Sequence, residues 1–281
     1  MWDIVALIFN QERVPSGPLH FGVRWQILLD ERCAADIGLR LERVSLDAGA
    51  VHDLRIPVTA LAWFQVLDGG AELFHGDERD DIAEEHVVFL PPGFEGRIDS
   101  KANASLLFAD VQNARRFDPA FGETPLSLRI VDWTREPVLL SEHDARKRIY
   151  LVTPKLFGTK AIKGEMIIYP PNTEAANHHH EGAAHFMYIL TGSGTCFANE
   201  APFRVRKGDI VYYPDRERHY LRSDPVGEMR FVEFFVPGQY KTVWAEGAKV
   251  CTWNPAGSDI RGNKAAREIQ AHSSAAPTSD I

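Results

Sequence analysis

The sequence predicts a mostly β protein built from two related barrels, and three observations predict it. Short runs rich in Val, Ile, Phe and Tyr follow one another between turn signals, which is typical of antiparallel sandwiches and barrels. The chain matches itself at a shift of 123 residues, so that Gly69 aligns with Gly192 and Pro91 with Pro214. Its 281 residues are 44% hydrophobic and 25% charged, which suits a soluble globular protein with a sizeable core.

The predicted strands follow in order along the chain, each before a turn that contains Gly or Pro. The first half offers residues 60–67 and 86–90, and the second half offers 163–169, 186–190, 210–213 and 229–236. Residues 117–146 are polar and contain three prolines, which indicates a connection between two β units. After Asn254 no apolar periodicity remains, so we expect a loose tail without a function over about the last 20 residues.

These features divide the chain into five segments. We predict an N-terminal segment over 1–34, an N-terminal barrel over 35–116, a connection over 117–150, a C-terminal barrel over 151–240, and an extension with the loose tail over 241–281.

Charge and cysteine usage exclude several classes of function. The net charge is −8 and no basic run exceeds Arg115-Arg116, which argues against a nucleic-acid partner. No apolar stretch approaches the roughly 18 to 20 residues of a spanning helix, so we expect no membrane attachment. Three cysteines without a CxxC pair suit free thiols in a reducing compartment, which predicts a cytoplasmic protein without disulfides.

Four of the eleven histidines carry the strongest chemical signal. Alternation along a strand places His178 and His180 on one face, and a turn is expected to return His185 on the paired strand. His219 follows a separate strand and is expected to arrive from across the barrel. Imidazoles at this spacing suit Fe, Mn, Co, Ni, Cu or Zn. The alternative is a histidine-rich surface loop that binds metal only adventitiously.

The pattern around these histidines resembles the two motifs of the cupin superfamily, G-x5-H-x-H-x3-4-E-x6-G and G-x5-P-x-G-x2-H-x3-N. Every spacing is kept. Four residues depart from the motifs: Asn172 replaces Gly, His185 replaces Glu, Arg216 replaces Gly and Ser223 replaces Asn. The resemblance implies jelly-roll barrels, also called double-stranded β-helices, and one divalent transition metal held by the four histidines.

The N-terminal half keeps the framework of these motifs but not the ligands. At the 123-residue shift the four metal positions fall on residues without a suitable donor atom, which are Arg55, Pro57, Ala62 and Gly96. The chain therefore resembles a bicupin with a degenerate N-terminal cupin and a metal-binding C-terminal cupin. Because cupins often pair their barrels, the resemblance also implies a homo-oligomer, expected to be a dimer.

Four neutral imidazoles would leave the ion with its full +2 charge, which favours a small anionic chelating substrate. With Fe(II) as the favoured metal and dioxygen as co-substrate, the resemblance implies a non-haem dioxygenase that cleaves a C–C bond of an aromatic or diketone compound. The alternative is a non-oxidative isomerase, decarboxylase, lyase or hydrolase that uses Mn, Zn or Ni as a Lewis acid; Cu is also possible. A ligand-binding cupin without turnover is the third possibility.

Three further residues are candidates for a catalytic role. Arg216 could hold a substrate carboxylate at the barrel mouth, or it could be a solvated turn residue paired with Asp215 or Glu217. Glu233 could act as a general base or orient a ligand histidine, or it could face outward and pair with an arginine. Tyr213 could donate a hydrogen bond to a developing oxyanion, or it could pack in the core.

Overall fold

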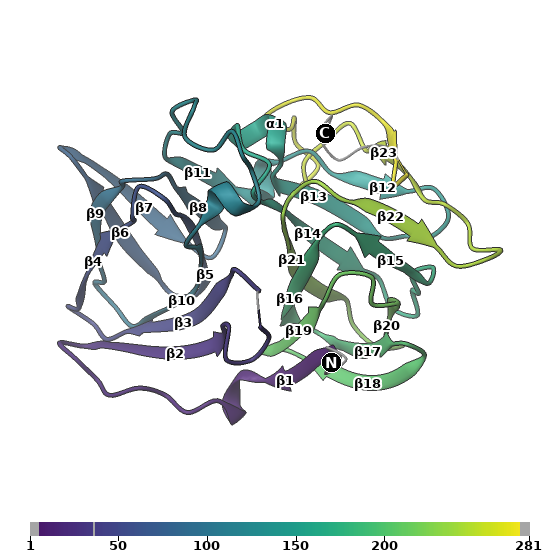
Figure 1. The fold of residues 1–281 in the computed structure, drawn as a ribbon, viewed down its shortest axis with the longest axis horizontal. Coiled ribbons are helices and arrows are strands. Elements are labelled where there is room, and N and C mark those ends of the chain that lie inside the picture. The colour runs from purple at the N-terminus through teal and green to yellow at the C-terminus, as the bar shows by residue number, and fades with distance from the viewer. Residues whose placement is uncertain (1–5, 36, 276–281) are drawn as a thin grey trace. The chain divides into compact units, whose positions relative to one another are not determined.

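The computed structural model describes residues 6–35 and 37–275, and it confirms the mostly β fold class. The chain forms two compact units, one of residues 14–132 and one of residues 1–13 with 133–281 (Figure 1). Cys33, Cys196 and Cys251 are free thiols, as predicted. Among the described residues, no helix has both the length and the apolar character needed to cross a membrane.

The unit of residues 14–132 consists of two antiparallel sheets. The first has the strand order β11-β8-β5-β10-β3-β2 and the second has the order β4-β9-β6-β7. The strands of the first sheet are β2 (Val23–Leu29), β3 (Arg40–Leu46), β5 (Leu61–Asp68), β8 (His86–Leu90), β10 (Ala104–Val111) and β11 (Arg129–Asp132). Those of the second are β4 (Val51–Arg55), β6 (Gly70–His75), β7 (Glu78–Ala83) and β9 (Glu95–Asp99), and a 3-10 helix covers Ala114–Arg116.

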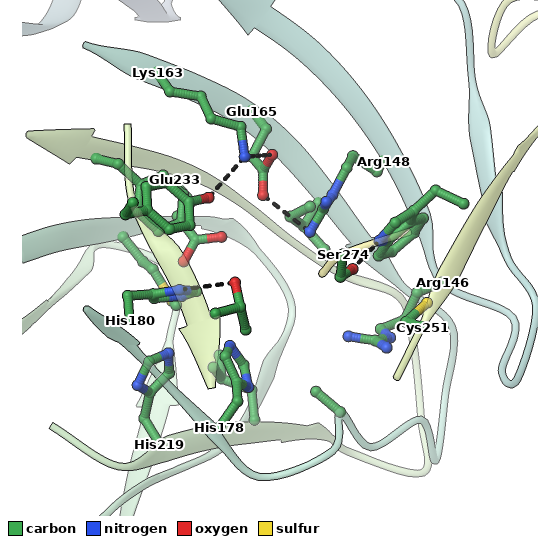
Figure 2. A pocket seen from close by; sticks show the side chains of 18 of the residues that line it. Arg146, Arg148, Lys163, Glu165, His178, His180, His219, Glu233, Cys251 and Ser274 are labelled. Atoms are coloured by element: carbon green, nitrogen blue, oxygen red, sulfur yellow. Dashed lines mark hydrogen bonds and ion pairs between the residues drawn. The ribbon is translucent and has the colours of Figure 1, made fainter. Parts of the chain in front are cut away.

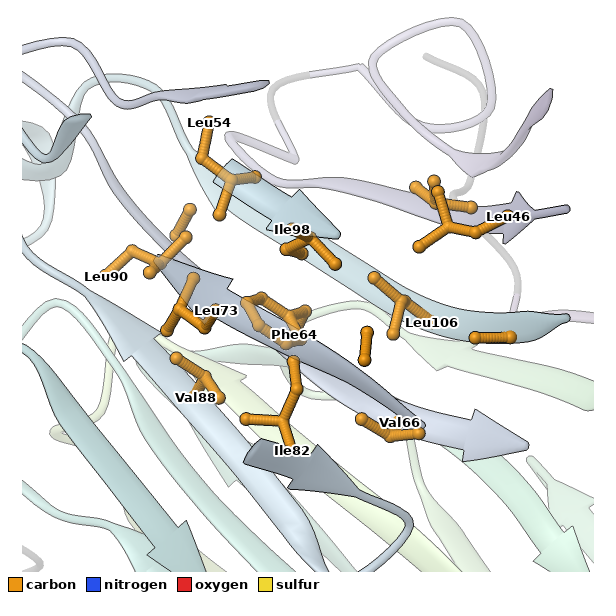
Figure 3. Close-up of a cluster of buried hydrophobic side chains, with 14 of the residues drawn as sticks. Leu46, Leu54, Phe64, Val66, Leu73, Ile82, Val88, Leu90, Ile98 and Leu106 are labelled. Carbon is orange, nitrogen blue, oxygen red and sulfur yellow. The ribbon is translucent and has the colours of Figure 1, made fainter. Parts of the chain in front are cut away.

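Apolar side chains from both sheets fill the interior of this unit (Figure 3). Phe64, Val88 and Leu106 come from the first sheet, and Leu73 and Ile98 come from the second. All five are fully buried. Each strand alternates its side chains between two faces, so one apolar face per sheet is enough to build this core.

The unit of residues 1–13 and 133–281 repeats this arrangement. Its sheets have the orders β1-β19-β16-β21-β14-β13-β12-β23-β24 and β18-β17-β20-β15-β22. The first contains β1 (Leu7–Asn10), β12 (Leu139–Ser141), β13 (Lys147–Val152), β14 (Lys163–Tyr169), β16 (Ala184–Thr191), β19 (Asp209–Tyr213), β21 (Met229–Val236), β23 (Thr252–Pro255) and β24 (His272–Ser273). The second contains β15 (His178–Glu181), β17 (Ser193–Ala198), β18 (Ala201–Arg206), β20 (His219–Ser223) and β22 (Lys241–Trp244). Short helices cover Gln11–Arg13, Trp133–Arg135 and Pro154–Phe157, the last being α1.

The structure confirms the internal repeat. The strand pairs β3 and β14, β5 and β16, β6 and β17, β7 and β18, and β8 and β19 each begin 123 residues apart. Gly69 and Gly192 occupy the same turn with φ of 75° and 76°. A Cβ atom would lie 2.4 Å from a backbone oxygen at Gly69 and 2.3 Å from one at Gly192. Both turns therefore require glycine.

Three of the predicted segments outside the barrels contain strands that belong to the two observed units. The predicted connection over 117–150 contains β11, β12 and β13, which extend the sheets of the two units. The predicted N-terminal segment over 1–34 contains β1, which pairs with β19, and β2, which pairs with β3. The predicted extension and tail contain β22, β23 and β24, and only residues 276–281 of the tail lie outside the described residues. The shortest of these strands, β12, β23 and β24, have only two to four residues, so their strand character arises from pairing with neighbours rather than from a pattern of their own.

Candidate metal centre

The four predicted histidines lie together at one end of the C-terminal barrel. β15 supplies His178 and His180, β16 supplies His185 and β20 supplies His219. Their ring centroids are 4.4 to 5.2 Å apart in the five closest pairs. The ligand atoms of His178, His180 and His219 all lie within 4.8 Å of one another (Figure 2).

The sheets that supply His185 and His219 differ from the prediction. β15 pairs with β20, so that His178 and His219 are direct cross-strand partners. His185 comes from β16 in the opposite sheet, where it pairs with Tyr213 and Phe235. Gly182 has a φ of 96°, and at this corner the chain passes from one sheet to the other instead of folding back as a hairpin. His219 is therefore the neighbour on the paired strand, and His185 is the donor from across the barrel.

Three of the rings are oriented by hydrogen bonds at Nδ1. Nδ1 of His178 lies 2.8 Å from the carbonyl oxygen of Ala176, and Nδ1 of His219 lies 2.8 Å from that of Glu217. Because a carbonyl oxygen can only accept, Nδ1 carries the proton in both rings and Nε2 keeps its lone pair. The Nδ1 of His180 lies 3.2 Å from the hydroxyl of Thr242.

The residues fit a transition metal on two observations. Nε2 of His219 and both ring nitrogens of His185 are buried without a hydrogen-bond partner, an arrangement that a bound cation would relieve. Burial lowers the pKa of all four imidazoles, to about 4 for His219, and the charges of neighbouring histidines lower the pKa of the other three further. The rings are therefore neutral at pH 7, as ligation requires.

Glu233 forms a second group of possible ligands with His180 and His185. Its Oε1 lies 3.3 Å from Nε2 of His185, without the geometry of a hydrogen bond. Glu233 is the direct cross-strand partner of Glu165. Burial and then this neighbouring carboxylate raise the pKa of Glu233 to about 8, although Arg148 and Lys163 act in the opposite direction. The Glu233 side chain therefore faces the histidines. It does not face outward to pair with an arginine, which was the alternative.

Known proteins resemble the chain both in sequence and in fold. Residues 165–235 match the family described as cupin domain. A mutant of oxalate decarboxylase OxdC from Bacillus subtilis has a TM-score of 0.67 at 16% identity, covering 87% of this chain and 80% of that chain. Another structure of oxalate decarboxylase, used to assign its Mn(II) centres, has a TM-score of 0.67 at 18% identity with the same coverage. The C-terminal barrel contains a cupin domain, and the whole chain has the two-barrel fold of a bicupin.

A curated relative of the bicupin is an uncharacterised protein of Methanocaldococcus jannaschii, 30% identical over 74 residues. The match spans 26% of the bicupin and 58% of that relative. The cupin-domain match lies in the C-terminal barrel, and the N-terminal barrel is assigned by its fold. Within the described part of residues 14–132, no three His, Cys, Asp or Glu ligand atoms lie within 4.8 Å of one another.

Two of the candidate catalytic residues do not line the cavity beside the histidines. The Arg216 side chain is 66% exposed and lies 3.5 Å from Glu181 and 3.7 Å from Asp215, which is the solvated-turn alternative. Tyr213 is fully buried, stacks on His219 at 4.4 Å and donates its hydroxyl proton to the carbonyl oxygen of Phe197. Its phenol is thereby directed away from the cavity, which is the core alternative.

Sequence reasoning missed a charged network in the cavity wall of the bicupin. Glu165 is fully buried; Arg148 lies 3.1 Å from its Oε1 and Lys163 lies 3.2 Å from its Oε2. Lys163 also donates a hydrogen bond of 2.7 Å to the hydroxyl of Tyr240. Although burial alone would raise it, the two cations hold the pKa of Glu165 below its ordinary value. The available signal was the spacing of two residues between Lys163 and Glu165, which places both charges on one face of a strand that is otherwise apolar.

Proposed function

We propose that the bicupin is a metal-dependent enzyme that performs a non-oxidative reaction, the loss of CO2 from a small carboxylate substrate. The observation that carries this proposal is the histidine cluster, in which hydrogen bonds orient three rings and leave unpartnered nitrogens facing one another. The fold likeness to oxalate decarboxylase supports the decarboxylase alternative over the iron dioxygenase that the sequence analysis preferred. This support is an analogy of fold, so the site must carry the chemistry.

The residues that would hold the metal are the four histidines at positions 178, 180, 185 and 219. When bound, a divalent ion acts as a Lewis acid that stabilises negative charge developing on a substrate oxygen. Mn(II) is the first metal to test because the similar oxalate decarboxylase contains Mn(II) centres. Imidazole also suits Fe, Ni, Zn and Cu, so the ligand set by itself does not choose among them.

The charged cavity wall would bind and orient the anionic substrate. Arg146, Arg148 and Lys163 line the cavity together with Glu165 and Glu233. When the C–C bond to the departing carboxylate breaks, its electron pair stays on the substrate carbon, which then takes up a proton. Glu233 is the carboxyl group closest to the histidines and also lines the cavity, so its carboxyl oxygen is the atom placed to supply that proton.

The test combines metal analysis with turnover in the presence and absence of oxygen. The purified chain is expected to hold one divalent metal per chain and to release CO2 from oxalate or a related carboxylate under argon. His180→Ala and His219→Ala should lose the metal, while His179→Ala, on the same strand as His180, should keep it.

Oxygen consumption in step with substrate loss would instead favour the dioxygenase. If both the His180 and His219 variants kept full metal occupancy, the ligand assignment would be wrong.

A further inference from the structure

The cavity continues from the histidines to a second end at Arg146 and Arg148 (Figure 2). Trp253 also lines the cavity and completes this end. The two arginines are two residues apart, so they share one face of the chain where it enters β13. Both guanidinium groups lie over the indole of Trp253, at 5.5 Å for Arg146 and 4.1 Å for Arg148. Trp253 lies on β23, beyond the segment that matches the cupin domain family.

This end of the cavity carries more positive than negative charge in its ion pairs. Asp144 holds Arg146 through two contacts of 2.8 Å, whereas Arg148 and Lys163 share the single carboxylate of Glu165. Three cations are thus paired with two carboxylates through direct ion pairs. Glu233, the cross-strand partner of Glu165, has its own close contact with His185. In addition, the Nε of Arg148 is buried without a hydrogen-bond partner. A bound anion would supply both the missing charge and the missing acceptor.

Aromatic side chains contribute to the cavity wall at both ends. Tyr169 lies 5.4 Å below the guanidinium of Arg146, and Trp244 lies 5.0 Å from the ring of His178. Both line the cavity, as do Tyr150 and Trp253. Such walls favour a planar, unsaturated ligand body over a flexible aliphatic one.

We propose that the Arg146–Arg148–Trp253 end is a carboxylate-binding subsite and that the substrate is a planar unsaturated or aromatic carboxylic acid. Its anchoring carboxylate lies at the two arginines, and the carboxylate that leaves as CO2 faces the histidines and Glu233. The inference rests on the proposed function only in taking this cavity as the place where the substrate binds.

The test is calorimetric titration of the purified full-length chain with benzoate as the probe. Benzoate is expected to bind at least about tenfold more tightly than benzamide, which lacks the charge, and than acetate, which lacks the ring. Because the subsite consists of the chain's own residues, benzoate should also bind after the metal is removed with a chelator. Equal affinity for benzoate and benzamide would overturn the proposal.

Two variants locate the binding. The double variant Asp144→Asn/Arg146→Gln removes both members of one ion pair and should weaken benzoate binding by tenfold or more. Arg148→Lys keeps the charge but loses the planar donor group, and it should weaken binding to a smaller extent. Arg206→Gln, at a side chain that is 69% exposed on β18, is the matched control and should bind as the parent chain does.

The two proposals fail in different ways. If benzoate binds with this selectivity but no metal is found, the proposed function is wrong and the subsite stands. If the chain holds a metal and releases CO2 but the arginine variants bind benzoate as tightly as the parent chain does, the subsite is wrong and the function stands.

Discussion

At the scale of single residues, Glu233 and Tyr213 both touch the histidine cluster, but their polar atoms face different surroundings. The carboxyl of Glu233 lines the cavity, whereas the hydroxyl of Tyr213 is directed to the backbone at Phe197. Glu233 can therefore exchange a proton with a ligand, and Tyr213 can only fix the position of a neighbouring ring. The same contrast separates His180, in the cavity wall, from His179, which is not part of it.

We expect Glu233→Gln to keep the metal and to lower turnover by about a hundredfold or more, because the amide cannot deliver a proton. Tyr213→Phe should change turnover by less than about threefold and lower the free energy of unfolding by about 1 kcal/mol, the value of one buried hydrogen bond. Metal content, turnover and denaturant unfolding of the two variants provide the measurement. Full activity of Glu233→Gln would remove the proton-transfer role.

At the scale of elements, the turn between β19 and β20 shows what the departure from the cupin motif costs. Arg216 has a φ of 66°, and the equivalent Gly93, 123 residues earlier, has a φ of 72°. A residue with a Cβ atom is strained in this left-handed conformation by roughly 1 kcal/mol or more. The exposed ion pairs of Arg216 with Glu181 and Asp215 offset little of this strain.

Arg216→Gly is accordingly expected to stabilise the chain by up to about 1 kcal/mol, with no loss of metal or turnover. The reverse change at the equivalent turn, Gly93→Arg, should destabilise it by a similar amount. Thermal unfolding of both variants checks the pair. A large loss of turnover in Arg216→Gly would restore the substrate-binding role that the sequence suggested for this arginine.

Strand β10 carries a carboxyl group that gives the N-terminal unit a pH dependence. Burial, and to a smaller extent the neighbouring Glu42, raises the pKa of Asp110 to about 6, although Arg40 and Gln112 act against the rise. The folded state therefore holds the proton more tightly than the unfolded state, whose pKa is near 3.8. The resulting stabilisation is fully present below about pH 4 and is lost as the pH rises through 6.

The free energy of unfolding of the parent chain should fall between pH 4.5 and 7.5 as Asp110 loses its proton. The free energy of unfolding of Asp110→Asn should change less over this range. The difference between the two proteins should reach at most about 3 kcal/mol at pH 7.5, in favour of the variant. Guanidinium unfolding across this pH range measures it, with Asp77→Asn on an exposed turn as the control. Parallel pH profiles of parent and Asp110→Asn would show that Asp110 is not the group responsible.

The elements also show how far sequence reasoning reaches. Strands with strong apolar runs, such as β5, β16 and β21, are predictable because each carries its own pattern. β13 has an apolar run of its own, which the predicted connection over 117–150 divides. β23 is not predictable in this way, because Trp253 acquires its place only by pairing with Ser141 of β12, far earlier in the chain. For the same reason the spacing of His178, His180, His185 and His219 predicts that they meet, but not which of them share a sheet.

At the scale of the whole molecule, one fold has been used in two ways. In residues 14–132 the positions that match the ligands hold Arg55, Pro57, Ala62 and Gly96, and a large apolar cluster fills much of the interior. In the C-terminal unit an apolar cluster that includes Ile189, Val211 and Phe231 fills one part of the barrel, and histidines together with charged and aromatic side chains line the cavity in another part. In the second barrel, ring nitrogens of His185 and His219 are buried without a hydrogen-bond partner, so we expect this barrel to gain more from a bound metal.

This difference predicts an unequal response to metal. A ligand that binds only the folded state stabilises it by about 2.7 kcal/mol at a free concentration one hundred times its dissociation constant. Removing the metal with a chelator should therefore lower the unfolding temperature of the unit of residues 133–281. Adding Mn(II) back should raise it again. The unit of residues 14–132 should unfold at an unchanged temperature if the two transitions separate. Calorimetry of the parent chain and of His219→Ala makes the comparison, since the variant should not respond to Mn(II). A metal-dependent shift that survives in His219→Ala would place the ion elsewhere in the molecule.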